Sequence, residues 1–261
     1  MKKKYFITSD VHSFYKEWKK ALKKAGFDID NKDHIIIHCG DLLDRGPDAI
    51  KCLKFVNKLP KDRKILIRGN HEDLLEDAIY RGYFQLNDYY NGTVDTVAQL
   101  TKRKLEDTNT EVRHAALIDV KENKDLKKYL KSTIDYYEIG NSIFCHGWLP
   151  VSAWTNKDSP DDVVHFGVNE NFRNASTHAW RDARWENGIQ AWDLGSRLEG
   201  KTIYCGHYHT SWGHHYLHKN GSEFGDDAIF DPFIDDGIVA LDACTAYSHK
   251  VNIVTIEEDI D

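Results

Sequence analysis

The first third of the chain repeats one pattern: a short hydrophobic run, a cluster of small and polar residues, and then a segment with helical spacing. The runs are rich in β-branched and aromatic residues and cover 4–8, 34–38 and 64–68. Asp10 and Asp41 in the following clusters are 31 residues apart, and Asp41 and Asn70 are 29 apart. This spacing is close to that of a strand, a helix and a parallel strand, so it predicts a β-α-β-α-β unit. Because functional groups of such sheets gather beyond the carboxyl ends of the strands, the three clusters are candidates for one site.

The pattern changes after this unit. Leu, Ala, Ile and Val recur with helical spacing among many charges over 73–131, which predicts a helical insertion at the mouth of the site. Strand signals return at 133–139 and 142–145 and predict a hairpin. The stretch 148–200 is expected to be rich in loops. Further strands are predicted at 202–205, 238–241 and 251–256.

Composition narrows the class of protein. The 261 residues include 35 Lys and Arg against 42 Asp and Glu, a net charge of −7, so stable binding of nucleic acid through many phosphate contacts is not expected. No apolar stretch approaches the roughly 18 residues that span a bilayer, and the basic start is followed by only a short apolar run. The sequence therefore predicts a soluble, cytoplasmic protein that does not associate with membranes.

Fourteen histidines stand out in the composition, because imidazole is the commonest metal ligand in proteins. Five short motifs, each after a predicted strand, place histidines beside acids and an amide. They supply the candidate ligands Asp10, His12, Asp41, Asn70, His146, His207 and His209. One such motif alone is more often a capped turn, but five at strand ends predict a metal site. These donors suit Mn, Fe or Zn, and an aspartate between two ions can bridge them.

The five motifs resemble those of the calcineurin-like metallophosphoesterases, and within them the phosphoprotein phosphatase branch. In the family's order they are Asp10-Val11-His12, Gly40-Asp41-Leu42-Leu43-Asp44-Arg45-Gly46, Arg68-Gly69-Asn70-His71-Glu72, Cys145-His146-Gly147 and Gly206-His207-Tyr208-His209. The resemblance implies an α/β fold, a four-layer αββα sandwich in which 1–261 form a single domain with a helical, cap-like insertion at about 73–131. It also implies an enzyme, a metal-dependent phosphatase or phosphoesterase.

The resemblance further implies two divalent metal ions as cofactors, with Mn²⁺ the first choice and Fe or Zn as alternatives. Carried over by position, the ligands of the first ion are Asp10, His12 and Asp41, and those of the second are Asp41, Asn70, His146 and His207. Asp41 would then bridge the two ions. His209 departs from the protein-phosphatase pattern but resembles the broader superfamily, where this residue completes the first metal site, so we expect it on or near that ion.

The resemblance also assigns catalytic and substrate-binding residues. His71 corresponds to the general acid, and Asp44 to the carboxylate that holds its other ring nitrogen. Arg45 supplies a planar fork for two phosphate oxygens. A second phosphate-binding arginine is expected between His146 and His207, and the candidates are Arg181, slightly preferred, and Arg184. The implied reaction is direct attack on phosphorus by a hydroxide that bridges the metals, with no covalent phosphoenzyme.

Three functions remain open at this stage. The first is hydrolysis of phosphate monoesters, either phosphoserine, phosphothreonine or phosphotyrosine in proteins or small phosphoesters. The second is symmetrical cleavage of dinucleoside tetraphosphates, which uses the same motifs. The third belongs to another class, a non-catalytic metal-bound protein that binds a phosphorylated partner. That function would require a broken catalytic set, whereas Asp44, Arg45 and His71 are all present.

Overall fold

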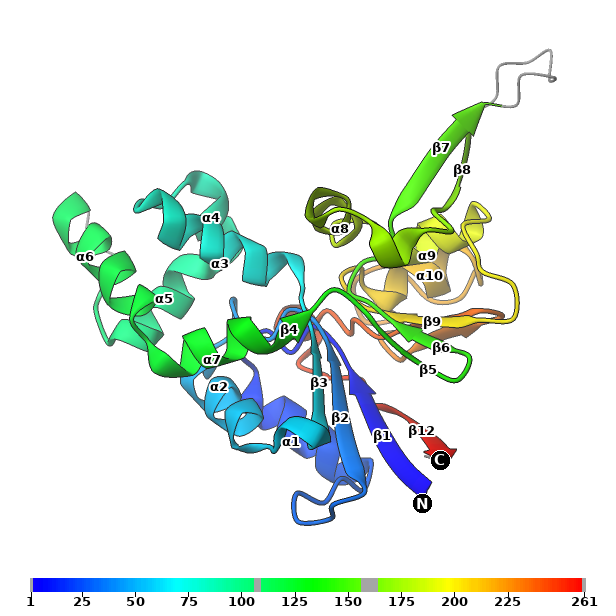
Figure 1. The fold of residues 1–261 in the computed structure, drawn as a ribbon, viewed down its shortest axis with the longest axis horizontal. Helices are drawn as coiled ribbons and strands as arrows, with labels where there is room; N and C mark the ends of the chain where they lie inside the picture. Colours follow the sequence, from blue (N-terminus) through cyan, green and yellow to red (C-terminus); the bar gives the residue numbers. More distant parts are fainter. Residues whose placement is uncertain (1, 106–108, 156–163, 260–261) are drawn as a thin grey trace.

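One sheet is mainly parallel, and three of its five strands come from about the first quarter of the chain (Figure 1). The computed structural model describes residues 2–105, 109–155 and 164–259. The strand order in this sheet is β12 (Val254–Asp259), β1 (Lys2–Thr8), β2 (His34–Cys39), β3 (Lys64–Ile67) and β4 (Thr133–Ile134). Strands β1 to β4 are parallel, and β12 pairs antiparallel with β1 at the edge. The predicted β-α-β-α-β unit is therefore confirmed in β1, β2 and β3.

A second sheet packs against the first. Its strand order is β10 (Phe233–Asp235), β11 (Ile238–Ala240), β9 (Thr202–Cys205), β6 (Ser142–Phe144) and β5 (Tyr137–Ile139). The three inner strands are parallel, and β10 and β5 are antiparallel to their neighbours. A separate hairpin of β7 (Val151–Thr155) and β8 (Val164–Val168) projects away from the body in Figure 1.

Helices pack on the outer faces of the sheets and over the edge of the first one (Figure 1). The first sheet is covered by α1 (Tyr15–Lys24) and α2 (Ala49–Lys58), and the second by α8 (Thr177–Ala183), α9 (Gly188–Asp193) and α10 (Thr210–Tyr216). Between β3 and β4 the chain forms α3 (Asn70–Arg81), α4 (Leu86–Tyr90), α5 (Thr93–Thr101), α6 (Thr110–Lys121) and α7 (Lys124–Ser132). The short elements are α11 (Thr245–Ser248) and the 3-10 turns Lys61–Arg63 and Phe172–Asn174. Across the described parts of the chain, every helix is too short or too polar to cross a membrane.

Alternating side chains on the central strands explain the four layers. In β1, Phe6 packs in the core formed with α1 and α2, whereas Tyr5 and Ile7 belong to the core between the two sheets. The rings of Phe144 and Tyr204 come from the second sheet, stack 4.8 Å apart and fill the same inter-sheet core. Successive residues of a strand point to opposite faces, so a strand buried on both faces must be apolar at nearly every position. The order helix, sheet, sheet, helix confirms the predicted αββα class.

One sequence-based expectation needs correction. The predicted strand 133–139 is wrong because it divides between the sheets: β4 pairs with β3, and β5 pairs with β6. At the break, Asp135 forms an ion pair with buried Arg184, and Tyr136 stacks on Trp180 with the ring centres 5.1 Å apart. The stretch 148–200, expected to be rich in loops, also contains β7, β8, α8 and α9. The helical pattern over 73–131 does match helices, α3 to α7.

Candidate metal centre

The five motifs meet beyond the carboxyl ends of strands from both sheets. Asp10 follows β1, Asp41 follows β2 and Asn70 follows β3, while His146 and His207 follow β6 and β9 of the second sheet. All five side chains are buried or nearly so. The two sheets thus bring the first and the last motifs together. Asp10 and His207 are joined by a hydrogen bond although they lie 197 residues apart in sequence.

Two groups of potential ligand atoms share Asp41. The first consists of His12, Asp41 and His71, and the second of Asp41, His146 and His207; within each group the ligand atoms lie within 4.8 Å of one another. The amide oxygen of Asn70 joins the second group, 2.8 Å from His146 Nε2 and 3.0 Å from His207 Nδ1. Where two cations lie about 3.5 to 4 Å apart, a carboxylate shared by the two ligand groups is the arrangement expected.

Hydrogen bonds to the main chain orient two of the imidazole rings. His12 Nδ1–H donates to the Leu43 carbonyl at 3.0 Å, and His146 Nδ1–H donates to the Cys39 carbonyl at 2.7 Å. Each bond fixes the tautomer and leaves Nε2 directed at the acids of the centre. Burial holds the pKa of His12 well below its usual value, so this ring is neutral near neutral pH, as a metal ligand must be.

The charges of His146 and Asp41 depend on each other. Burial by itself lowers the pKa of His146, but the Asp41 carboxylate 3.3 Å from Nε2 raises it to about 10. For Asp41 the two effects have the opposite sign. Burial by itself raises the pKa of this carboxyl, but the neighbouring His146 and His71 together hold the pKa well below its usual value. A cation bound at this place would displace the proton from His146, so metal binding there is coupled to proton release.

Asp10 provides the clearest sign that these residues fit a cation. Its Oδ2 accepts the His207 N–H at 3.0 Å, whereas its buried Oδ1 has no hydrogen-bond partner among the described residues. Burial, with Asp242 nearby, raises the pKa of Asp10 well above its usual value. An unpaired buried carboxylate oxygen is costly, and a cation held between Asp10 and His12 would remove that cost.

Arg45 lies at the same place. Its Nη1 donates to His12 Nε2 at 3.2 Å and its Nη2 to His71 Nε2 at 3.1 Å. The positively charged guanidinium therefore occupies a position where two imidazole lone pairs converge. In this structure the arginine predicted to bind phosphate is directed at the candidate ligands, and a cation on His12 would free its fork for an anion.

The backbone around the centre adopts an uncommon conformation. Asp10, His12, Asp41 and His207 all have positive φ, between 47° and 65°. Non-glycine residues adopt this left-handed region rarely and at a cost, and such residues cluster at functional sites. Strained backbone at four candidate ligands supports a functional centre over a merely structural polar cluster.

His71 is held by a carboxylate that is itself held by two threonines. His71 Nδ1–H donates to Asp44 Oδ2 at 2.8 Å. Thr93 and Thr96 on α5 donate their hydroxyls to Asp44 at 2.9 and 2.6 Å, and the Thr96 hydroxyl also accepts the Asp44 N–H at 3.0 Å. The close approach of α5 to Asp44 and Arg45 requires Gly92, since a Cβ at position 92 would lie 2.4 Å from the backbone nitrogen of Arg45. The helical insertion thus orients the candidate general acid.

We expect Thr96→Val to lower kcat on a phosphoester with a poor leaving group about tenfold, because a hydrogen bond to a charged acceptor contributes about 1.5 to 3 kcal/mol. Metal content should not change, and Thr96→Ser should restore activity. The matched control is Thr101→Val on the same helix; among the described residues, the Thr101 hydroxyl donates to the Val97 carbonyl alone. Equal kcat for Thr96→Val and Thr101→Val would show that Thr96 does not position the acid.

His209 is not among the two groups of potential ligand atoms found in the described residues, and its place on the first ion stays a prediction. Its Nδ1 lies 2.9 Å from the Ser211 hydroxyl, and its Nε2 lies 3.4 Å from Glu223. The first group consists of Asp41, His12 and His71. Both ring nitrogens of His209 have other partners because α10 begins at the next residue and brings Ser211 back to the ring.

Neither candidate for the second phosphate-binding arginine lies free at the centre. Arg184 is buried between Asp73, at 2.7 Å, and Asp135. Arg181 is half-exposed and pairs with Asp77 at 2.6 Å. In the described chain both guanidinium groups are thus paired with carboxylates, and Arg184 connects the α8 segment to the crossover between the sheets.

Sequence reasoning missed Thr93, Thr96 and Trp185. The two threonines are three residues apart on one helix face, and a pair of polar residues on the buried side of a helix is a signal that could have indicated them. Trp185 follows α8 and is 49% exposed, and its ring lies edge-on to His207 with the ring centres 5.8 Å apart. Nothing in the sequence around Trp185 distinguishes it from the other tryptophans.

Comparison with known proteins identifies the family. The model of the calcineurin-like phosphoesterase family matches residues 3–229, and the chain therefore belongs to this family. The family is one of phosphoesterases, and it implies divalent metal ions as cofactors.

Individual relatives carry different activities. The chain is 49% identical over 78 residues to a symmetrical bis(5'-nucleosyl)-tetraphosphatase of Buchnera aphidicola, a match that covers 30% of this chain and 27% of the relative. It is 25% identical to the asymmetrical bis(5'-nucleosyl)-tetraphosphatase PrpE of Oceanobacillus iheyensis, over 97% of this chain and 88% of that protein. The matches to the first group of curated relatives thus span only about a quarter of their length.

The fold is similar to that of a cold-active protein-tyrosine phosphatase from a Shewanella species. The TM-score is 0.52 at 16% sequence identity, over 97% of this chain and 75% of that one. At this identity the likeness concerns the fold alone.

Proposed function

We propose that the protein is a dinuclear metal-dependent phosphoesterase in which Asp41 bridges two divalent cations, with Mn²⁺ as the first choice. The observation that carries the proposal is that Asp41 belongs to both groups of ligand atoms. When bound, such a pair of cations supplies hydroxide near neutral pH by lowering the pKa of water. No side chain is then required as a nucleophile.

The chain's own residues account for the other tasks. His71 is held through Nδ1 by Asp44 and directs Nε2 into the centre, where the ring would deliver a proton to the leaving group when Nε2 carries one in place of the Arg45 hydrogen bond. Arg45 offers two N–H groups of one planar fork, which suits two oxygens of a phosphoryl group. Buried Glu72 accepts the N–H groups of Gly69, Asp41 and Leu42, and so fixes the loops that carry the ligands.

We infer that dinucleoside tetraphosphates are the preferred substrates. The half-exposed indole of Trp185 next to His207 gives a flat apolar surface at the edge of the centre, on which a nucleobase could stack while the phosphates reach the cations. A relative that matches nearly the whole chain is named as a dinucleoside tetraphosphatase. Sequence alone placed phosphate monoesters first and dinucleoside tetraphosphates second, and the present proposal reverses that order.

Phosphate monoesters remain the second candidate. The motif set around Asp44, Arg45 and His71 resembles that of phosphoprotein phosphatases, and the same hydroxide and acid would act on a monoester. Arg45 provides one fork for a terminal phosphoryl group. Because Arg181 and Arg184 are paired with carboxylates, the described residues offer a small dianion fewer cationic groups than the sequence predicted.

The deciding experiment compares diadenosine tetraphosphate with a phosphopeptide and p-nitrophenyl phosphate, each with Mn²⁺ and with excess chelator. We expect hydrolysis that is lost with chelator, and faster turnover of the dinucleotide. Chromatography of the products separates symmetrical cleavage, which gives two ADP, from asymmetrical cleavage, which gives ATP and AMP. Faster turnover of the phosphopeptide would establish the second candidate, and no turnover with any divalent metal would refute both.

Trp185→Ala tests the stacking surface. We expect KM for diadenosine tetraphosphate to rise roughly tenfold, because stacking of one base on an aromatic ring is worth about 1 to 3 kcal/mol. KM for p-nitrophenyl phosphate should change little. Tyr80→Ala is the control, since Tyr80 is an exposed aromatic residue of α3 and shares its hollow with none of the candidate metal ligands among the described residues. An equal rise in KM for both substrates would argue against a base-binding role.

A further inference from the structure

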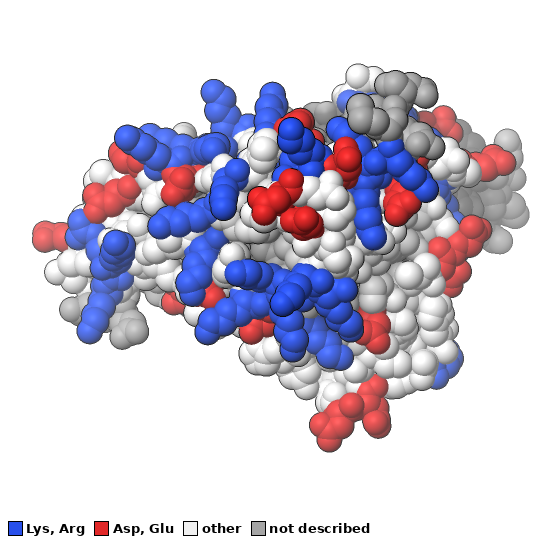
Figure 2. All heavy atoms as spheres, turned by 90° about the horizontal axis from the view of Figure 1, so that it is seen from below, with Lys and Arg blue, Asp and Glu red and all other residues white. Residues whose placement is uncertain are grey.

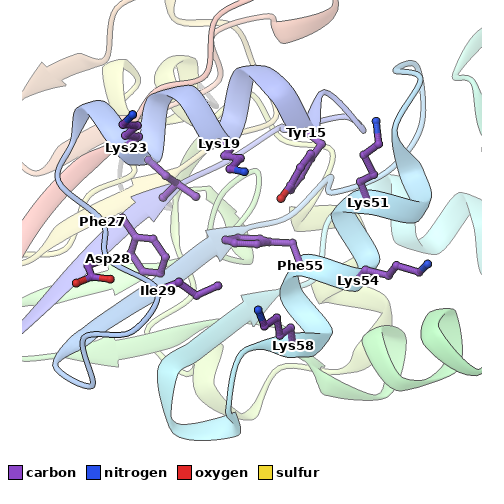
Figure 3. A pocket seen from close by; sticks show the side chains of 11 residues that line it. Tyr15, Lys19, Lys23, Phe27, Asp28, Ile29, Lys51, Lys54, Phe55 and Lys58 are labelled. Carbon is purple, nitrogen blue, oxygen red and sulfur yellow. The ribbon is translucent and has the colours of Figure 1, made fainter.

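A hollow lies between α1 and α2 on the outer face of the first sheet, outside the metal centre (Figure 3). Its volume is about 740 Å³, within the range of binding pockets of roughly 300 to 1,000 Å³. We call it the α1–α2 trough, after the two helices that form its walls. None of the candidate metal ligands or catalytic residues lines it.

Lysines form both rims of the trough. Lys19 and Lys23 come from α1, and Lys51, Lys54 and Lys58 come from α2. All five are exposed. Positions 51, 54 and 58 follow one face of α2, so this row extends over about 10 Å at 1.5 Å per residue. Lys51 pairs with Asp48 at 2.6 Å, and Asp28 is the acid among the lining residues, so positive charge dominates the rims.

The floor between these rows is apolar. It is formed by Tyr15, Leu22, Phe27, Ile29 and Phe55. The Phe55 ring packs edge to face against Tyr15 and Phe27, with ring centres 5.9 and 6.5 Å apart, and against buried Trp18 at 5.0 Å. Because Phe55 is anchored on the core in this way, the floor is preformed, and it leaves apolar surface accessible between the lysine rows.

The positive charge continues beyond the trough. A second hollow of about 560 Å³ shares Lys58 and is lined also by Lys61, Lys64, Lys128 and Lys131. On the face shown in Figure 2, lysine and arginine side chains gather densely, with fewer acids among them. This face contrasts with the chain's net charge of −7, so the basic surface is a local feature, and its length suits an extended partner rather than a compact anion.

We propose that the α1–α2 trough binds an acidic amphipathic helix of a partner protein. An apolar stripe on that helix would lie on the floor around Phe55, and carboxylates on both sides of the stripe would meet the two lysine rows. This is the helix-in-groove mode of recognition, and the opposite charges on the rims steer the encounter. A nucleic-acid strand fits less well, because its phosphates follow one side of the chain whereas the trough has a positive row on each side of an apolar floor.

The test uses a fluorescently labelled synthetic helix of about 18 residues with a leucine stripe flanked on both sides by glutamates. Binding to the full chain is followed by anisotropy at low and high salt. The double variant Lys19→Glu, Lys23→Glu is compared with Lys20→Glu, Lys24→Glu, which has the same charge change, helix and spacing but lies outside the trough. We expect the first variant to weaken binding about tenfold or more and the second to change it little.

Two further probes examine the floor and the class of partner. A peptide with serine in place of leucine should bind at least about tenfold more weakly, since it keeps the charges but loses the apolar contact. Phosphoesterase activity should be the same in both lysine variants, which verifies their folding. Equal weakening in the two variants, no binding of the leucine peptide, or tighter binding of an oligouridylate than of that peptide would each overturn the proposal.

Discussion

Replacing His71 with asparagine is expected to slow hydrolysis of a phosphoester with a poor leaving group by roughly 10² to 10⁴-fold, the contribution of general acid catalysis. Asparagine cannot deliver a proton, whereas the His71 ring is buried, bonded to Asp44 at 2.8 Å and directed into the centre. The loss should be far smaller for p-nitrophenyl phosphate, whose leaving group needs no proton.

The His71 experiment requires a measurement of bound metal, because His71 Nε2 also belongs to the first group of potential ligand atoms. We expect the metal content of His71→Asn to stay near two ions per chain. The control is His178→Asn, a change at an exposed histidine of α8. If metal content falls in step with activity, His71 is a ligand; if turnover of the poor leaving group is unchanged, it is not the acid.

Asp41→Asn is expected to abolish metal binding and activity together. The Oδ2 of Asp41 lies 3.7 Å from His12 Nε2 and 3.3 Å from His146 Nε2, so one substitution removes the shared negative ligand of both groups. We expect activity to fall by at least about a thousandfold, because each cation supplies several kcal/mol of transition-state stabilisation and 1.36 kcal/mol corresponds to tenfold in rate.

Metal content and thermal unfolding of Asp41→Asn should be measured with activity. The fold is expected to persist, since the inter-sheet core is formed by apolar residues that do not depend on Asp41. Asp48→Asn is the control, because Asp48 is an acid at the start of α2 that pairs only with Lys51 in the described contacts. Retention of two tightly bound ions by Asp41→Asn would contradict the bridging role.

Much of the fold could be predicted because its signals are local. The hydrophobic runs that became β1, β2 and β3 each end in a polar cluster at a spacing close to 30 residues, and parallel strands joined by helices bring such clusters to one edge. The segments before His146 and His207 were also identified as strands. The sequence therefore brought the ligands of both sheets into one hypothesis.

What could not be predicted depends on contacts that are distant in sequence. The chain leaves the first sheet at Ile134 and enters the second at Tyr137, and this break depends on Arg184 and Trp180, which are more than forty residues away. The partner of Arg181 is Asp77 on α3, which lies 104 residues away in sequence. Thr93 and Thr96 reach Asp44 only because the helical insertion folds back onto the Arg45 loop at Gly92. Spacing along the chain does not report such pairings.

The central claim is that two cations share Asp41. The most direct test is anomalous diffraction at the manganese edge from crystals of the protein grown with Mn²⁺. The account predicts two anomalous peaks about 3.5 to 4 Å apart, with Asp41 between them, Asp10 and His12 on one side, and Asn70, His146 and His207 on the other. A single peak, or peaks that leave Asp41 outside the coordination shell, would contradict it.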